Sequence, residues 1–184
     1  MFLTNTIGVQ GTSKGVLFLM GSIRKSSKQI KLDLESSLFA LIKEKKYHEI
    51  SIDDLCKKAN VGRTSFYRHF YDKDDVILFA YVRMWEDWCE SHNVKERSKF
   101  DIENAETFFA YNFSIRDRLD ITYRNNLGHI ILKSFELLMT DDNEHNYESM
   151  FYGYGLFGIL KEWWNRGFKE SSNEVAKILR QMYQ

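Results

Sequence analysis

A short polar stretch from Arg63 to His69 carries side chains that are suited to binding nucleic acid. Arginine offers paired donors that match a guanine edge, and hydroxyl, phenol and imidazole groups bond readily to bases or phosphate oxygens. Phe66 and Phe70 lie four residues apart, so a helix would turn both rings inward and leave the polar groups outside. The outward-facing candidates are Arg63, Thr64, Ser65, Tyr67, Arg68 and His69.

The residues before this stretch predict a helix that ends in a tight turn. Ser51 with Asp54 three residues later is the pattern of a capping box, and Ile52, Leu55, Cys56 and Ala59 would form its buried face. Asn60-Val61-Gly62 then breaks the helix, because Asn and Gly tolerate left-handed backbone. Two short helices joined this way, between Ser51 and Phe70, indicate a helix-turn-helix whose second helix, Arg63 to Phe70, can enter the major groove.

Two further helices should hold this pair in place. Apolar residues recur at helical spacing from Ser27 to Lys45, which predicts one long amphipathic helix. Asp72 and Asp75 form a second cap pattern and open a helix that runs from Lys73 to about Ser91. Lys73 at the start of that helix, and Ser51 at the start of the earlier one, are placed to add phosphate contacts.

The run SIDDLCKKANVGRTSFYRHFYDKDDV, residues 51–76, resembles the DNA-binding domain of the TetR/AcrR family of bacterial transcriptional regulators. The resemblance extends over about residues 27–88. It rests on the amphipathic first helix, the Ser51 cap, the turn at Ala59 to Val61, and the Phe66-Tyr67-Arg68-His69-Phe70 segment. Asn60, Gly62 and Cys56 depart from the residues that are common there.

The resemblance implies roles for individual residues and for the whole chain. Ser51, Tyr67, His69 and Lys73 would anchor phosphates, whereas Arg63, Thr64, Ser65 and Arg68 would lie nearer the bases. It also implies a homodimer formed by the last two helices, a palindromic operator, and release by an effector bound in the C-terminal domain. Two alternatives share this head: an activator controlled by a protein partner, and an interaction module that does not bind DNA.

Composition favours an all-α fold, and the sequence gives no sign of an enzyme. The chain has no proline, and 43% of its residues are hydrophobic. Its net charge is zero, but residues 22–71 hold 11 Lys and Arg against 6 Asp and Glu, a balance of +5, so the remainder carries −5. We find no phosphate-binding glycine loop, nucleophile elbow or zinc signature, and expect no metal or other cofactor. The two cysteines and the absence of a membrane-length apolar run favour a cytoplasmic protein.

The sequence divides into three parts. Residues 1–22 are predicted to be a disordered leader or tag, residues 23–71 the helix-turn-helix domain, and residues 72–184 a helical regulatory and dimerisation domain. Apolar patterns within the last part predict helices at about 103–113, 115–124, 127–139, 147–166 and 172–183. Gly167 should end one helix, and Ser171 with Glu174 should begin the next.

Candidate regulatory residues are less specific, because aromatic side chains often serve only as core. The expected effector pocket consists of Phe109, Phe113, Tyr123, His129 and Phe135, with core packing as the alternative for each. Gly155 and Gly158 would allow close helix approach at a dimer interface, to which Trp163 is also assigned. The acidic run at residues 141–145 lacks the spacing of a calcium loop and is interpreted as a solvated connection.

Overall fold

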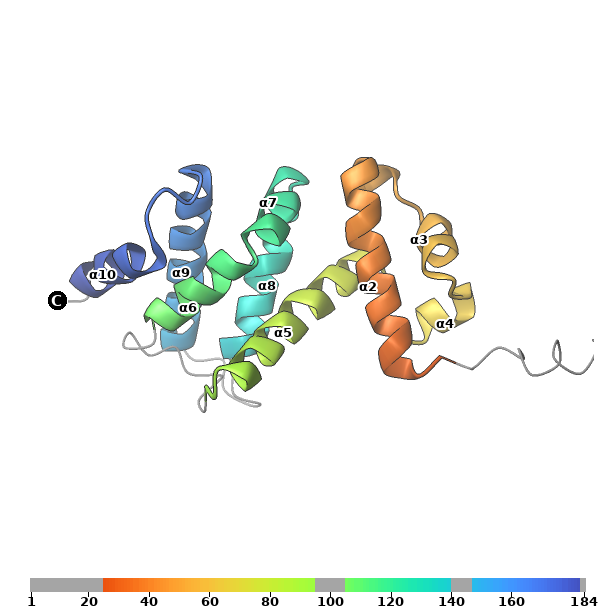
Figure 1. Cartoon of the computed structure of the whole chain (residues 1–184), viewed down its shortest axis with the longest axis horizontal. Coiled ribbons are helices and arrows are strands. Elements are labelled where there is room, and N and C mark those ends of the chain that lie inside the picture. The colour runs from red at the N-terminus through yellow and green to blue at the C-terminus, as the bar shows by residue number, and fades with distance from the viewer. Residues whose placement is uncertain (1–24, 95–104, 140–146, 183–184) are drawn as a thin grey trace, which may run out of the picture.

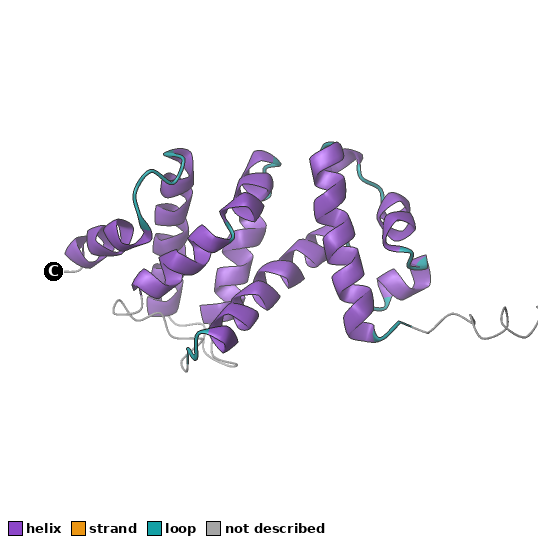
Figure 2. Ribbon diagram, viewed as in Figure 1, coloured by secondary structure: helices purple, strands orange, loops and turns teal. Residues whose placement is uncertain are grey.

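The computed structural model describes residues 25–94, 105–139 and 147–182, and every regular element in them is helical (Figures 1 and 2). The all-α prediction is confirmed. The predicted leader and the acidic run at 141–145 lie outside the described residues. The elements are α2 Ser27–Glu44, a 3-10 turn η1 Tyr47–Glu49, α3 Ile52–Ala59, α4 Arg63–Tyr67, α5 Lys73–Ser91, α6 Ala105–Ser114, α7 Arg116–Arg124, α8 Gly128–Met139, α9 Tyr147–Asn165 and α10 Ser172–Met182.

Helices α2, α3 and α4 form the N-terminal head at one end of the molecule (Figure 1). Leu34 and Leu38 of α2, Leu55 of α3 and Phe66 of α4 are all 0% exposed and belong to one core cluster. The long apolar stripe of α2 is therefore the surface on which the two short helices rest. Their mutual arrangement depends on this packing, because helices of this length are marginal in isolation.

Helix α5 leaves the head and crosses to the second group of helices, where it packs on α8 (Figure 1). It begins as predicted: the Asp72 side chain accepts from the backbone N–H of Asp75 at 3.0 Å, and Asp75 accepts from the Tyr71 N–H at 2.9 Å. Val76 and Ile77, in the first turns of α5, are buried in the core. The helix is thus shared by both parts of the chain.

Helices α6 to α10 form the regulatory part, with α10 at the end opposite the head (Figure 1). α6 packs on α10, and α8 packs on both α5 and α9. The turn after α9 uses Gly167 at φ +72°, and Ser171 with Glu174 then caps α10 through reciprocal hydrogen bonds. None of the helices in the described parts of the chain is long and apolar enough to cross a membrane.

A buried ion pair fastens the head to α5. Glu35 of α2 is only 3% exposed. Arg83 of α5 donates to both of its carboxylate oxygens, from Nε to Oε2 at 2.9 Å and from Nη2 to Oε1 at 2.6 Å. Arg118 of α7 lies farther off, with Nη1 at 3.8 Å from Oε1. This geometry satisfies the charge that α2 would otherwise bury alone.

Replacing Arg83 alone should lower the free energy of unfolding more than replacing both Arg83 and Glu35. Arg83→Met leaves the Glu35 carboxylate buried without its bidentate partner, and we expect it to lower the free energy of unfolding by about 3 kcal/mol. Adding Glu35→Leu should restore part of that loss. A double-mutant cycle from urea unfolding measures the coupling, and losses that simply add would contradict it.

Candidate nucleic-acid interface and regulatory cavities

The start of α3 is held by the predicted capping box. Ser51 Oγ accepts from the Asp54 N–H at 3.0 Å, and Asp54 Oδ2 accepts from the Ser51 N–H at 3.0 Å. Lys45 adds an ion pair to the same carboxylate at 2.8 Å. The Lys45 hydrogen bond and then the Ser51 bonds hold the pKa of Asp54 well below its usual range. Ser51 is exposed, so its helix end faces solvent and can meet a phosphate.

The turn between the two short helices has the geometry that its residues predict. Asn60 adopts a left-handed conformation with φ 51° and ψ 51°, and its N–H donates to carbonyls of the last turn of α3. Val61 N–H donates to the Cys56 carbonyl at 3.0 Å, and Gly62 precedes α4 as its N-cap. The chain therefore reverses within three residues and sends α4 across α3.

Helix α4 is shorter than predicted: it ends at Tyr67, not at Phe70. The next residues remain coiled, because the N–H groups of His69 and Phe70 both donate to the Phe66 carbonyl, at 2.9 Å each. The tighter bond from His69 spans three residues and turns the chain toward the Asp72 cap of α5. Phe66 and Phe70 still point inward, with exposures of 0% and 6%.

The predicted base-reading face is on the surface. Arg63, Thr64 and Arg68 are exposed, and Ser65 is half-buried. Arg63 forms an ion pair with Asp53 of α3 at 3.1 Å. This guanidinium must therefore leave the Asp53 carboxylate before it can contact a base. Arg68 forms no hydrogen bond or ion pair with the described residues. The structure therefore offers Arg68 as the less encumbered of the two arginines.

The residues predicted to contact phosphates differ in their exposure and in their contacts within the protein. Tyr67 is 50% exposed, and its ring packs edge-on against Phe66. His69 is half-buried, with Nδ1 3.5 Å from Ser27 Oγ, and burial followed by the charges of Lys31 and Arg68 lowers its pKa. Its imidazole is consequently neutral at pH 7 in the free protein.

Lys73 has a structural role that sequence reasoning missed. Its ammonium donates to the carbonyls of Ile50 at 2.5 Å and Tyr47 at 2.9 Å and lies 4.3 Å from the centre of the Tyr47 ring. Two of its three protons therefore hold the loop that precedes Ser51, which leaves one for a phosphate. The helix position of Lys73 was apparent in the sequence, but its contact with a loop 23 residues upstream was not.

The same loop also joins the head to the regulatory helices. The backbone N–H of Tyr47 donates to Asn125 Oδ1 at 3.2 Å, and the Tyr47 hydroxyl donates to Asp74. His129 of α8 approaches Asp74 on the other side, at 3.5 Å. The contact of Tyr47 with Asn125 spans 78 residues of sequence and that of Tyr47 with Asp74 spans 27, so no local pattern could have indicated them.

Most of the predicted effector-pocket residues are core. Phe109, Phe135 and Tyr123 are 0%, 5% and 7% exposed. Tyr123 stacks on Trp164, and its hydroxyl has no hydrogen-bond partner among the described residues. The core alternative for His129 is wrong, because its side chain is 63% exposed and pairs with Asp74 at the surface, and its assignment to an effector pocket stays a prediction. Of the five, Phe113 lines a described cavity.

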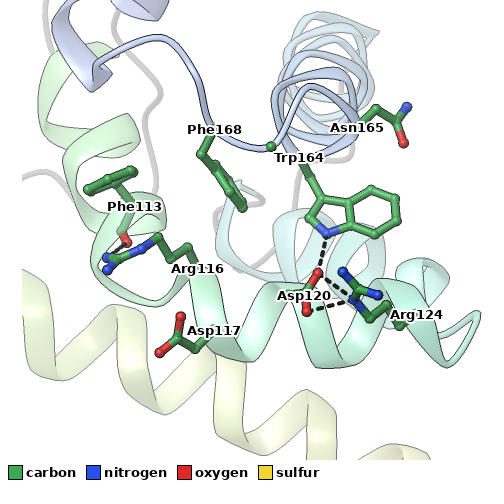
Figure 3. A pocket seen from close by; sticks show the side chains of 9 residues that line it. Phe113, Arg116, Asp117, Asp120, Arg124, Trp164, Asn165 and Phe168 are labelled. Atoms are coloured by element: carbon green, nitrogen blue, oxygen red, sulfur yellow. Dashed lines mark hydrogen bonds and ion pairs between the residues drawn. The ribbon is translucent and has the colours of Figure 1, made fainter.

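That cavity, of about 590 Å³, lies between α7 and the turn that follows α9 (Figure 3). Three of the charged groups in its lining, Arg116, Asp120 and Arg124, are engaged with one another or with neighbouring groups, whereas Asp117 is exposed. Asp120 accepts from Arg124 Nε at 2.7 Å and from Trp164 Nε1 at 3.1 Å, and Arg116 donates to the Phe113 carbonyl at 3.0 Å. Within the described residues, no three His, Cys, Asp or Glu side chains gather as a metal site would require.

The predicted dimer residues separate into two groups. Trp163 is 2% exposed, packs against Phe109 and Phe168, and donates from Nε1 to the Glu170 carbonyl at 3.0 Å. Its assignment to a dimer interface is wrong, because the ring is already enclosed within the subunit. Gly155 and Gly158 lie exposed on α9, with open space where a side chain would begin.

The turn geometry gives a direct test of the helix-turn-helix. Asn60→Ala puts a residue without a compensating side-chain bond into left-handed backbone, and we expect a loss of about 1 kcal/mol in the free energy of unfolding. Asn60→Gly is the matched control and should change it by less than about 0.5 kcal/mol, because glycine adopts this conformation freely. Equal losses in thermal or urea unfolding would argue against a strained turn.

Comparison with known proteins agrees with this architecture. A model described as bacterial regulatory proteins of the tetR family matches residues 37–79, and a TetR-type model described as a transcriptional regulator C-terminal region matches residues 100–184. The HTH-type transcriptional regulator EthR of Mycolicibacterium smegmatis is 39% identical over 59 residues, which are 30% of this chain and 27% of that protein.

The crystal structure of Lin0861 from Listeria innocua has the same fold, with a TM-score of 0.62 over 83% of this chain and 90% of that one, at 14% identity. The two family models match separate parts of the chain, the head with the start of α5 and then the regulatory helices. The chain therefore belongs to the TetR family of bacterial transcriptional regulators.

Proposed function

We propose that the protein represses transcription by binding a palindromic operator as a homodimer, and that an effector bound in its C-terminal domain releases it. The observation that carries this proposal is the exposed polar face of α4. Its buried side is fixed by Phe66, which is 0% exposed, so the opposite side is held outward as a rigid unit. Arg63 and Arg68 on that side have the donor geometry that reads guanine in the major groove.

The uneven distribution of charge supports DNA at the head. Residues 22–71 carry +5, and the rest of the chain carries −5. A basic head is attracted to phosphate, and an acidic remainder is kept away from it. This arrangement orients the molecule on DNA before any base is read. A regulator of this kind acts in the cytoplasm, where bacterial operators lie.

A homodimer is proposed for two reasons. One helix as short as α4 contacts few base pairs, so two heads are needed for useful specificity. The last two helices also expose large apolar side chains that a second copy would cover: Phe151, Tyr154, Ile178 and Met182 are 65%, 51%, 47% and 70% exposed. The exposed Gly155 and Gly158 on α9 would let a partner helix approach closely.

Effector release would act through the contacts that tie head to regulatory helices. Glu35 with Arg83, and Tyr47 with Asn125, set the angle at which the head stands on α5 and α7. Two heads on one face of a duplex must lie about 34–36 Å apart. A shift of α5 or α7 would change that separation and lower the affinity for the operator.

The decisive experiment is selection of bound duplexes from a random DNA library by the purified full chain at physiological salt. We expect a palindromic motif with half-sites about one helical turn apart. Failure to enrich any motif, with the protein folded and dimeric, would overturn operator binding. It would instead favour a regulator that needs a protein partner, or an interaction module.

Residue roles can be separated by comparing two substitutions on α4. Arg68→Ala should cost about 1–3 kcal/mol per half-site on the selected operator, and much less on random DNA, because it removes a base contact. Tyr67→Phe keeps the ring on Phe66 and should weaken both DNAs alike, because it removes a phosphate contact. Fluorescence anisotropy gives the affinity of each variant for the operator and for random DNA. Equal losses of affinity for the two DNAs in Arg68→Ala would refute base reading.

His69 should make operator affinity depend on pH. Its pKa is lowered from 6.5 in the free protein, so the imidazole is neutral at pH 7 and gains a proton as the pH falls. Because the imidazolium pairs with phosphate more strongly, affinity should rise between pH 7 and pH 5.5. His69→Gln should flatten this rise, whereas His48→Gln, at an exposed site near the head, should preserve it. An unchanged slope in His69→Gln would exclude His69 as a phosphate contact.

A further inference from the structure

A second cavity, of about 650 Å³, lies between the head and the regulatory helices. Its wall is formed by α2 on one side and by α7 with the residues just before it on the other, and Met84 of α5 completes it. The lining is mostly apolar, with Phe39 and Ala40 opposite Ile115 and Ile121. A volume of this size accommodates a small organic molecule.

Arg118 stands in this wall with its hydrogen-bonding capacity unused. The guanidinium lies 3.9 Å from the centre of the Phe39 ring and donates no hydrogen bond to the described residues. Nη1 is buried without a partner. Its nearest carboxylate is Glu35, at 3.8 Å, but both oxygens of Glu35 already accept from Arg83. About a third of the Arg118 side chain, 34%, remains exposed.

The other charges around the cavity limit which anion would fit. Lys43 also lines it and forms no ion pair with a described residue. Glu44 is neutralised by Lys58 at 2.7 Å, and Asp117 is a second carboxylate in the lining. One anionic charge is therefore favoured near Arg118, while a dianion such as phosphate would be repelled by Asp117 and would meet apolar walls.

We propose that this cavity binds a small amphipathic monocarboxylate, an aromatic or medium-chain acid, whose carboxylate pairs with Arg118. Its apolar part lies against Phe39, Met84 and Ile121. In the cavity at Phe113, Arg124 is paired with Asp120, and Arg116 is exposed, donates from Nη1 to the Phe113 carbonyl and lies over the Phe113 ring. Arg118 differs from both, because its Nη1 is buried without a hydrogen-bond partner beside an apolar lining, where a charge-assisted hydrogen bond is strong.

The position of the cavity makes such a ligand an effector, an inference that rests on the proposed function and places the effector at the boundary of the C-terminal domain with the head. Phe39 and Ala40 move with the head, and Ile115 and Ile121 move with the regulatory helices. A molecule bound between them stabilises whichever head orientation leaves room for it. Operator affinity and ligand affinity are then linked reciprocally, without any contact between ligand and DNA.

The test measures binding of octanoate and 4-phenylbutanoate to the full chain by calorimetry, with octanamide as the uncharged match. Both acids should bind, and octanamide should bind more weakly. Arg118→Met should weaken the acids about 10- to 100-fold, the range expected for a charge-assisted hydrogen bond. Ser36→Trp, at an exposed position in the lining, should block binding without disturbing Arg118. Arg124→Met, in the other cavity, is the control and should leave binding unchanged.

Operator affinity is measured separately, with and without octanoate. If the acids bind through Arg118 but the protein selects no operator, the proposed binding site is supported and the proposed function is overturned. Two results would overturn the site alone while the protein still binds its operator. In one, neither acid binds; in the other, the acids bind equally well to Arg118→Met and to Ser36→Trp. Loss of binding in Arg124→Met and not in Arg118→Met would place the ligand in the other cavity and refute the proposal.

Discussion

The buried contact between Glu35 and Arg83 is the constraint on which the arrangement of the two parts depends. Glu35 is 3% exposed and the Arg83 side chain is 24% exposed, so a small displacement would leave a buried carboxylate without its partner. Apolar packing between α2 and α5 tolerates sliding, but a bidentate arginine does not. The head is therefore held to α5 at a defined angle, and α4 inherits its orientation from that angle.

Local signals in the sequence were enough to predict the head. The Ser51 capping box, the left-handed Asn60 and the inward pair Phe66 and Phe70 each act within a few residues, and each has the predicted geometry. The end of α4 was misjudged, because the chain beyond Tyr67 still coils and no residue there marks a stop. The helices of the regulatory part also lie within one or two residues of their predicted bounds, because apolar runs and signals such as Gly167 and Ser171 with Glu174 mark them.

Roles that depend on distant partners could not be predicted in the same way. The carboxylate that draws His129 to the surface is Asp74, 55 positions earlier in the chain. Trp163 is enclosed by Phe109 and by the turn at Phe168, so an aromatic position that suggested an interface is core. The open donors of Arg118 arise because Arg83 occupies Glu35, a competition that only the folded arrangement creates.

The sharing of α5 has a consequence for how regulators of this type can recombine. Its first turns bury Val76 and Ile77 in the core that both parts share, and Arg83 pairs with Glu35, so the stretch through Arg83 is tied to the head. A gene fusion that joined this head to a foreign regulatory domain at residue 72 would strand Glu35 in an apolar contact. Exchange in evolution, or in engineered sensors, would succeed more readily where the crossover lies within the second half of α5.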